Sequence, residues 1–166
     1  AVTRHFLALA LALIAALPLA GCRQADGPMP QQQADTDNRI GDLSRDLLAV
    51  AKGEASGTQD FLDDAKTFAP NSQVEQAVER MGRKLADAVK GRALTEQAAR
   101  QLAHSSWTIA SASELSERQY ETVREDLRSQ LTAIGVGQPA VDAIVADAAT
   151  AQAAVSTRPR RWYEVF

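Results

Sequence analysis

Apolar side chains recur every three or four residues through most of this chain, which is the spacing of one face of an α-helix. Six stretches follow this rule, and each is bounded by residues that start or stop helices. The predicted helices cover residues 37–52, 58–69, 72–90, 95–112, 116–134 and 139–155. No stretch of the sequence alternates apolar and polar residues with turn signals as a sheet would require, so the pattern predicts an all-α protein.

Residues suited to cap helices stand at the predicted ends. Five of them can accept hydrogen bonds from the first free amides of a helix: Asp37, Thr58, Ser72, Thr95 and Ser116. The ranges 72–75 and 116–119 each have the spacing of a capping box. The predicted stop residues are Gly53, Pro70, Gly91 and Gly135. Pro139 suits the first turn of the last helix, because a first-turn amide needs no partner within the helix.

Each predicted helix carries a one-sided apolar stripe, which must be buried against a neighbour. The stripes are Ile40, Leu43, Leu47, Val50; Phe61, Leu62, Ala65, Phe68; Val74, Val78, Met81, Leu85, Val89; Ala99, Leu102, Ala103, Ser106, Ile109, Ala110; Tyr120, Val123, Leu127, Leu131, Ile134; and Val141, Ile144, Val145, Ala148, Val155. Short loops make successive helices antiparallel. We therefore predict an antiparallel bundle of five to six amphipathic helices, followed by an irregular or extended C-terminal arm.

Residues 22–36 have the composition of a flexible tether. They contain two prolines and three successive glutamines, with Met29 as the one large apolar side chain. Such a segment buries too little surface to offset the entropy lost on ordering. The predicted organisation is a signal peptide over 1–21, the tether over 22–36, the helical bundle over 37–155 and the arm over 156–166.

The first residues have the layout of a secretory signal. Arg4 precedes a run of 15 mostly apolar residues from Phe6 to Ala20, and small residues follow at a cleavage position. The run ends in the sequence Leu19-Ala20-Gly21-Cys22. This tetrapeptide resembles the lipobox of bacterial lipoproteins, which implies cleavage before Cys22, a diacylglyceryl group on the Cys22 thiol and acylation of the new N-terminus.

The lipobox resemblance also implies a location on the periplasmic face of the cell envelope. Arg23 follows the cysteine where an Asp would direct a lipoprotein to the inner membrane, so the outer membrane is favoured. A transmembrane anchor is the alternative, but the 15-residue run is interrupted by Pro18, and a spanning helix needs about 20 apolar residues. Cys22 is the only cysteine, so no intramolecular disulfide can form.

The charge balance argues against nucleic acid as a partner. Removal of the first 21 residues leaves 145 residues with 17 Lys and Arg against 21 Asp and Glu, a size that fits one small domain. Residues 34–79 carry ten acids and four bases, whereas residues 80–100 carry six bases and two acids. We interpret this asymmetry as helix faces that pair with one another.

The sequence contains few candidate residues for catalysis or metal binding. His104 is the one histidine left after processing, and no cysteine or histidine stands at ligand spacing from it. The adjacent acid pairs at 63–64 and 125–126 point about 100° apart on a helix, so neither serves one site unaided. The glutamates of 117–125 alternate with arginines, which predicts a salt-bridged exposed face. We predict no catalytic residue, no metal and no cofactor besides the lipid; an enzyme with a polar pocket near His104 is the alternative.

The arm concentrates arginine and aromatic side chains. It includes Arg158, Arg160, Arg161, Trp162, Tyr163 and Phe166, with three of the seven aromatics that follow the signal. These residue types are enriched at interface hot spots. One prediction is that they bind an unidentified protein partner; the other is that the arm packs over the bundle.

A short stretch at 115–119, Leu-Ser-Glu-Arg-Gln, resembles the Leu-Thr-Xaa-Xaa-Gln signature of small helical periplasmic proteins of the Spy and CpxP type. That resemblance implies an ATP-independent chaperone or a stress sensor. The expected function is a membrane-anchored periplasmic lipoprotein that serves as a structural or binding component of an envelope assembly, and the Spy/CpxP-type activity is the alternative.

Overall fold

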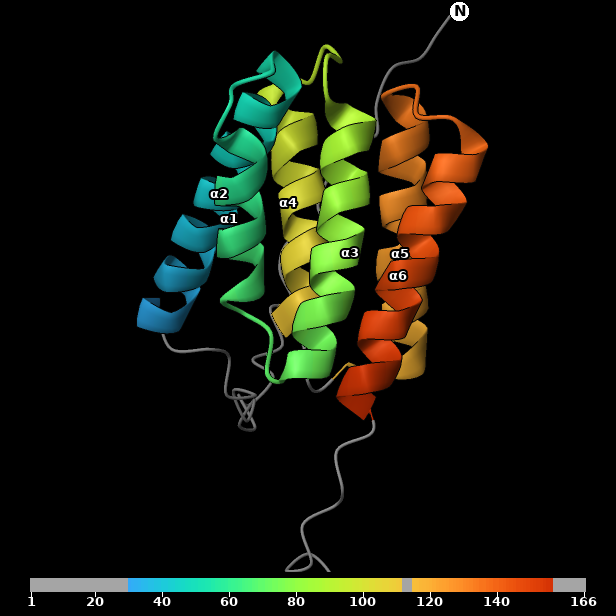
Figure 1. Ribbon diagram of the computed structural model, residues 1–166. Helices are drawn as coiled ribbons and strands as arrows, with labels where there is room; N and C mark the ends of the chain where they lie inside the picture. Colours follow the sequence, from blue (N-terminus) through green and yellow to red (C-terminus); the bar gives the residue numbers. More distant parts are fainter. Residues whose placement is uncertain (1–29, 112–114, 157–166) are drawn as a thin grey trace, which may run out of the picture.

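The computed structural model describes residues 30–111 and 115–156, which form six α-helices (Figure 1). The helices are α1 (Pro30–Lys52), α2 (Gly57–Lys66), α3 (Ser72–Val89), α4 (Glu96–Ser111), α5 (Glu117–Ala133) and α6 (Gln138–Ser156). Neither of these two ranges contains a β-strand. The predicted all-α class is therefore confirmed.

Successive helices run antiparallel and lie in two layers of three (Figure 1). One layer holds α2, α3 and α6, and the other holds α1, α4 and α5. The most extensive contacts join α3 to α6 within the first layer and α1 to α4 within the second. Each helix thus buries its apolar stripe both against a neighbour in its own layer and against the other layer.

Because the number of antiparallel helices is even, the chain enters and leaves the bundle at the same end. The start of α1, at Pro30, and the end of α6, at Ser156, both lie at the lower end of the bundle in Figure 1. The loops at 53–56, 90–95 and 134–137 lie at the opposite end.

The first helix begins earlier than the predicted start at residue 37. Helix α1 begins at Pro30, so residues 30–36 of the predicted tether are helical, and Asp37 lies within the helix and does not cap it. A proline is tolerated at the first helical position, and the glutamines and Ala34 that follow are good helix formers. Residues 33–35 of this extension are exposed, so these three residues add no buried surface to the helix.

Helix α3 is capped by a different residue from the one predicted. Asn71 is the N-cap, and its Oδ1 accepts hydrogen bonds from the amides of Gln73 and Val74 at 3.0 Å each. Ser72 is the first helical residue, so the predicted capping box at 72–75 does not form. Asparagine is as good an N-cap as serine, and its position one residue earlier decides the start.

Two of the five predicted caps, Thr95 and Ser116, are confirmed. Thr95 Oγ1 accepts from the amide of Ala98 at 3.2 Å at the start of α4. The capping box of α5 is complete: the Ser116 amide donates to Gln119 Oε1 at 2.8 Å, and the Gln119 amide donates to Ser116 Oγ at 3.4 Å.

Helix α2 is shorter than the predicted 58–69. It begins at Gly57 after Ser56, whose side chain makes no capping hydrogen bond, and Thr58 lies inside the helix. It ends where the Thr67 hydroxyl donates to the carbonyl of Asp64 at 2.7 Å, before Pro70 is reached. Packing against α1, and not a cap, therefore sets the start of this helix.

The predicted stripes form one core. Every stripe residue whose side chain is described is buried, except Phe68, Val123 and Ile134, which are half-buried against the core. The side chain of Val155 lies outside the description. The alanine-rich stripe of α4 allows close packing, since this helix touches all five others.

Two glycines illustrate how tightly α2 packs. A Cβ on Gly57 would lie 2.8 Å from the backbone nitrogen of Val50 in α1. A Cβ on Gly41, in the middle of α1, would meet nothing within 4 Å.

We expect Gly57→Ala to destabilise the bundle by about 1–3 kcal/mol, because the backbone of α1 must move to make room. Gly41→Ala should stabilise it by about 0.5–1 kcal/mol, since alanine restricts the unfolded chain and favours helix. Urea unfolding followed by circular dichroism measures both free energies. Equal effects of the two substitutions would contradict the close approach.

Candidate functional site

A groove of about 310 Å³, lined by residues of polar type, lies between α4 and α5. Its lining residues are Gln97, Arg100, Gln101, His104, Ser105, Asp126 and Gln130. Within it, Ser105 is buried and its hydroxyl donates to Gln130 Oε1 at 3.2 Å, which ties the two helices together. The partner of the serine is an amide oxygen, which is not a base, so this contact holds the helices and does not activate a nucleophile.

His104 stands at the exposed rim of this groove. Its ring lies 6.5 Å from the ring of the half-buried Trp107, with the planes tilted by 46°. Among the described residues, no group of three or more His, Cys, Asp or Glu could hold a metal ion. The charged side chains that line the groove are Arg100 and Asp126. Because these and the neighbouring amides carry donors and acceptors, the groove can bind hydrogen-bonding groups.

A pair of carboxyl groups lies between α1 and α2. Asp46 of α1 is half-buried, and its Oδ2 has no hydrogen-bond partner. The pKa of Asp46 is raised from an ordinary 3.8 to about 6, first by burial and then by the negative charges of Asp64 and Asp60 on α2. Two like charges held near each other favour the neutral form of a carboxyl group, and the carboxyl group of Asp64 has the larger such effect on Asp46.

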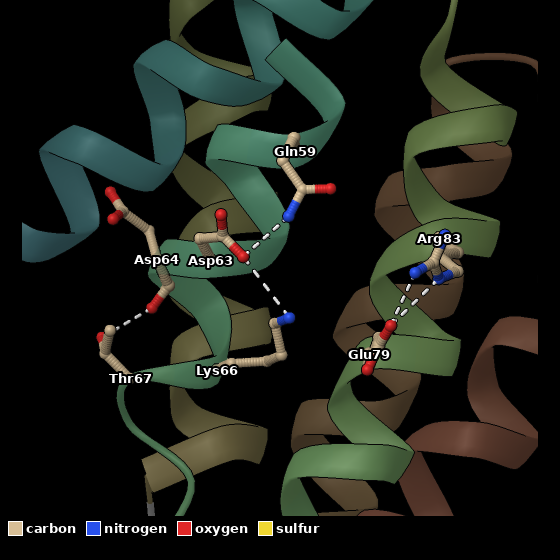
Figure 2. A network of polar contacts seen from close by, with 7 residues as sticks. All are labelled: Gln59, Asp63, Asp64, Lys66, Thr67, Glu79 and Arg83. Carbon is tan, nitrogen blue, oxygen red and sulfur yellow. Dashed lines mark hydrogen bonds and ion pairs between the residues drawn. The ribbon is translucent and has the colours of Figure 1, made fainter. Parts of the chain in front are cut away.

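Figure 2 shows why the adjacent aspartates of α2 differ. The Asp63 carboxylate accepts from Gln59 Nε2 at 2.8 Å and pairs with Lys66 Nζ at 3.4 Å, so the pKa of Asp63 is lowered. The Asp64 carboxylate points away from this network. The prediction that residues 63–64 do not share one site is confirmed, but Asp64 meets a carboxyl group from another helix instead.

The sequence did not reveal the Asp46–Asp64 pair. Asp46 stands directly before Leu47, three residues after Leu43, at the edge of the buried stripe of α1. An acid at the margin of an apolar stripe is the available signal. The partner could not be found without knowing the rotation of α2 against α1.

The predicted salt-bridged face of α5 forms only in part within the helix. Arg128 pairs with Glu125 at 3.6 Å and also reaches Asp142 on α6. Arg124 pairs with Glu117 at 3.5 Å, and it donates to the side chain of Gln152 on α6. These arginines thus join two helices, as well as residues of one.

Gln152 is the most enclosed member of this α5–α6 network. It is 4% exposed, and its Nε2 donates to Glu117 Oε2 at 3.0 Å while its Oε1 accepts from Arg124. Across α6, Asp147 pairs with Lys84 at 2.6 Å and with Arg80 at 3.6 Å on α3. These two basic side chains of α3 thus pair with an acid of α6, and not with the acidic stretch at 34–79.

The site residues predicted from the sequence lie outside the described ranges. Cys22 and the arm residues Arg158, Arg160, Arg161, Trp162, Tyr163 and Phe166 all fall there. No helix in the described part of the chain has the length and apolarity to cross a membrane.

Comparison with known proteins finds no matching family model, no similar curated protein and no similar solved structure. The Spy/CpxP-like stretch at 115–119 contains the capping box of α5, so its serine and glutamine have a local structural role here.

We expect Asp46→Asn to stabilise the protein at pH 7.5 by about 1 kcal/mol, a figure that allows for solvent screening at a half-buried site. The folded-state pKa of Asp46 exceeds its unfolded value of 3.8. The contribution of Asp46 to the free energy of unfolding is therefore most favourable below about pH 4, and it is lost as the pH rises through about 6. The difference in melting temperature between wild type and variant should vanish at pH 4.

Asp63→Asn is the matched control, because the pKa of Asp63 is shifted the other way. Asp63 contributes above pH 3.8, so this variant should lose stability at neutral pH and none in acid. The pH dependence of the melting temperature between pH 4 and 7 should change more in Asp46→Asn than in Asp63→Asn. The reverse result would contradict the raised pKa of Asp46.

Proposed function

We propose that this protein is a lipid-anchored helical bundle on the periplasmic face of the cell envelope, with the outer membrane favoured. It serves as a structural or binding component of an envelope assembly. The observation that carries this proposal is the sequence Leu19-Ala20-Gly21-Cys22 at the end of a basic-then-apolar leader.

The described chemistry supports a structural or binding role. The polar side chains that meet between helices are Ser105 with Gln130, Gln152 with Glu117, and Asp147 with Lys84, and each contact joins two helices. Such contacts fix the packing of one helix against another. The arm is the proposed binding segment, on the strength of its arginines and aromatics.

A Spy/CpxP-type chaperone is the alternative, favoured by the stretch at 115–119. It would need an apolar surface for unfolded clients. Within residues 33–111 and 115–154, every Leu, Ile, Val, Met, Phe, Trp and Tyr is buried or half-buried. Suppression of client aggregation at low molar ratio would favour the chaperone over the assembly component.

We expect Cys22→Ser to move the protein from the membrane fraction to the soluble fraction of cell lysates. Acyl chains contribute about 0.8 kcal/mol per buried CH₂, so several chains hold a protein on the membrane and their loss releases it. Mass spectrometry of the wild-type N-terminal peptide should show a lipid on Cys22. A wild-type protein that carries no lipid would overturn the proposed anchor.

Removal of Arg158–Phe166 separates the two predictions for the arm. If the arm is a binding segment, helicity and melting temperature should stay within about 2 °C of the full chain, since a change of about 0.5 kcal/mol shifts the melting temperature of a domain this size by that amount. A large drop in melting temperature would show that the arm packs on the bundle.

A further inference from the structure

The groove between α4 and α5 carries one positive and one negative side chain, and the two come from different helices. Arg100 lies on α4 and Asp126 on α5, and both are exposed. Neither side chain forms an ion pair or a hydrogen bond with another residue in the described part of the chain. By contrast, Arg124 and Arg128 of α5 both pair with acids. Arg100 and Asp126 are therefore available to charged groups of a ligand.

The antiparallel arrangement of the two helices sets how far apart these charges lie. Ser105 of α4 lies opposite Gln130 of α5, because its hydroxyl donates to Gln130 Oε1 at 3.2 Å. Arg100 precedes Ser105 by five residues, and Asp126 precedes Gln130 by four. On antiparallel helices these steps go in opposite directions (Figure 1), so the Cα atoms of Arg100 and Asp126 are about 13 Å apart along the helix axes. The two charges thus lie at opposite ends of the groove.

Amide side chains line the groove together with these charges. Gln130 Oε1 accepts from the buried Ser105, which leaves the Nε2 group of Gln130 as a donor. Gln97 and Gln101 of α4 are exposed in the same groove, and each side chain carries both donors and an acceptor. Such groups match a peptide backbone, in which each unit offers one N–H donor and one C=O acceptor.

The spacing of the charges limits the length of a ligand that reaches both. An extended peptide advances about 3.3–3.6 Å per residue, so three or four residues cover the distance between Arg100 and Asp126. A free amino acid is too short to do so. The groove volume of about 310 Å³ lies at the lower end of the range of roughly 300–1,000 Å³ found for ligand pockets. Both quantities favour a small ligand with an ammonium group at one end and a carboxylate at the other.

We infer that this groove binds a short peptide of three or four residues with free termini. The ammonium group of the peptide lies against Asp126, and its carboxylate accepts hydrogen bonds from Arg100. The side-chain amides of Gln101 and Gln130 bind the peptide groups between them. This site goes beyond the proposed function and does not depend on the anchor at Cys22, since its residues all belong to α4 and α5.

Trialanine is the probe for this site, because its small side chains leave the backbone and the termini as its binding groups. Ligand-observed NMR with the full chain in detergent micelles measures its affinity, and micelles alone give the background. We expect a dissociation constant of about 0.1–1 mM, as is usual for a ligand of this size. N-acetyltrialanine and trialanine amide each lack one terminal charge and should bind about tenfold more weakly.

Substitutions assign each end of the peptide to one side chain. Arg100→Gln should weaken trialanine binding about tenfold and leave the affinity for trialanine amide unchanged, because that ligand has no carboxylate. Asp126→Asn should have the same effect on trialanine and none on N-acetyltrialanine. Arg118→Gln and Glu121→Gln are the matched controls, since both residues are exposed on α5 outside the groove, and they should change no affinity. The melting temperature shows that all four variants are folded.

The results separate this site from non-specific binding and from the anchor. Absence of trialanine binding at millimolar concentration overturns the inference. So does equal binding of trialanine and its two capped forms, or an equal loss of affinity in Arg100→Gln and Arg118→Gln. Free alanine that binds as tightly as trialanine overturns the assignment of two distant charges to one ligand. None of these results changes the test of the lipid on Cys22, which is read from the mass of the N-terminal peptide.

Discussion

The structure depends on one constraint, which is that six helices, each apolar on one side only, must all bury that side at once. Two layers of three satisfy it, because α3 and α4 occupy the middle of each layer and meet helices on both flanks. Their buried faces accordingly include small residues, such as Ala77 and Gly82 of α3 and Ala103 of α4. The close contact of Gly57 with the backbone of α1 follows from the same demand, since α2 is short and can bury its stripe only by lying tightly on its neighbours.

Polar contacts fix how the helices are rotated about their axes. Arg92, in the loop after α3, donates to the carbonyl of Gly135 at 2.8 Å and to that of Ala88 at 2.5 Å, so it joins two loops at one end of the bundle. Gln152 of α6 likewise joins two helices, because its side chain hydrogen-bonds to Arg124 and Glu117 of α5. Each of these groups would be costly to leave unpaired, which penalises any rotation of a helix about its axis. The approach of Asp46 to Asp64 has the opposite character, because the like charges of two ionised carboxyl groups repel each other.

The candidate sites differ in how far residue patterns could predict them. Cys22 and the arm are visible as local composition, and they remain predictions because they lie outside the described ranges. The groove beside His104 and the Asp46–Asp64 pair are made by residues far apart in sequence, and only the packing of α4 on α5 and of α2 on α1 creates them. The predicted capping box at 72–75 shows the same limit on a smaller scale, because two neighbouring residues could cap α3 and the backbone conformation of Asn71 decided between them.

The sequence by itself determined the all-α class, the buried stripes of the helices and most of their ends, because these follow from interactions within three or four residues. It did not determine the start of α1, where exposed residues precede the buried stripe, or the length of α2, where contact with α1 decides. Only the tertiary structure placed the beginning of α1 and the end of α6 at one end of the bundle. That placement is a property of the whole topology, because an even number of antiparallel helices returns the chain to the end at which it entered.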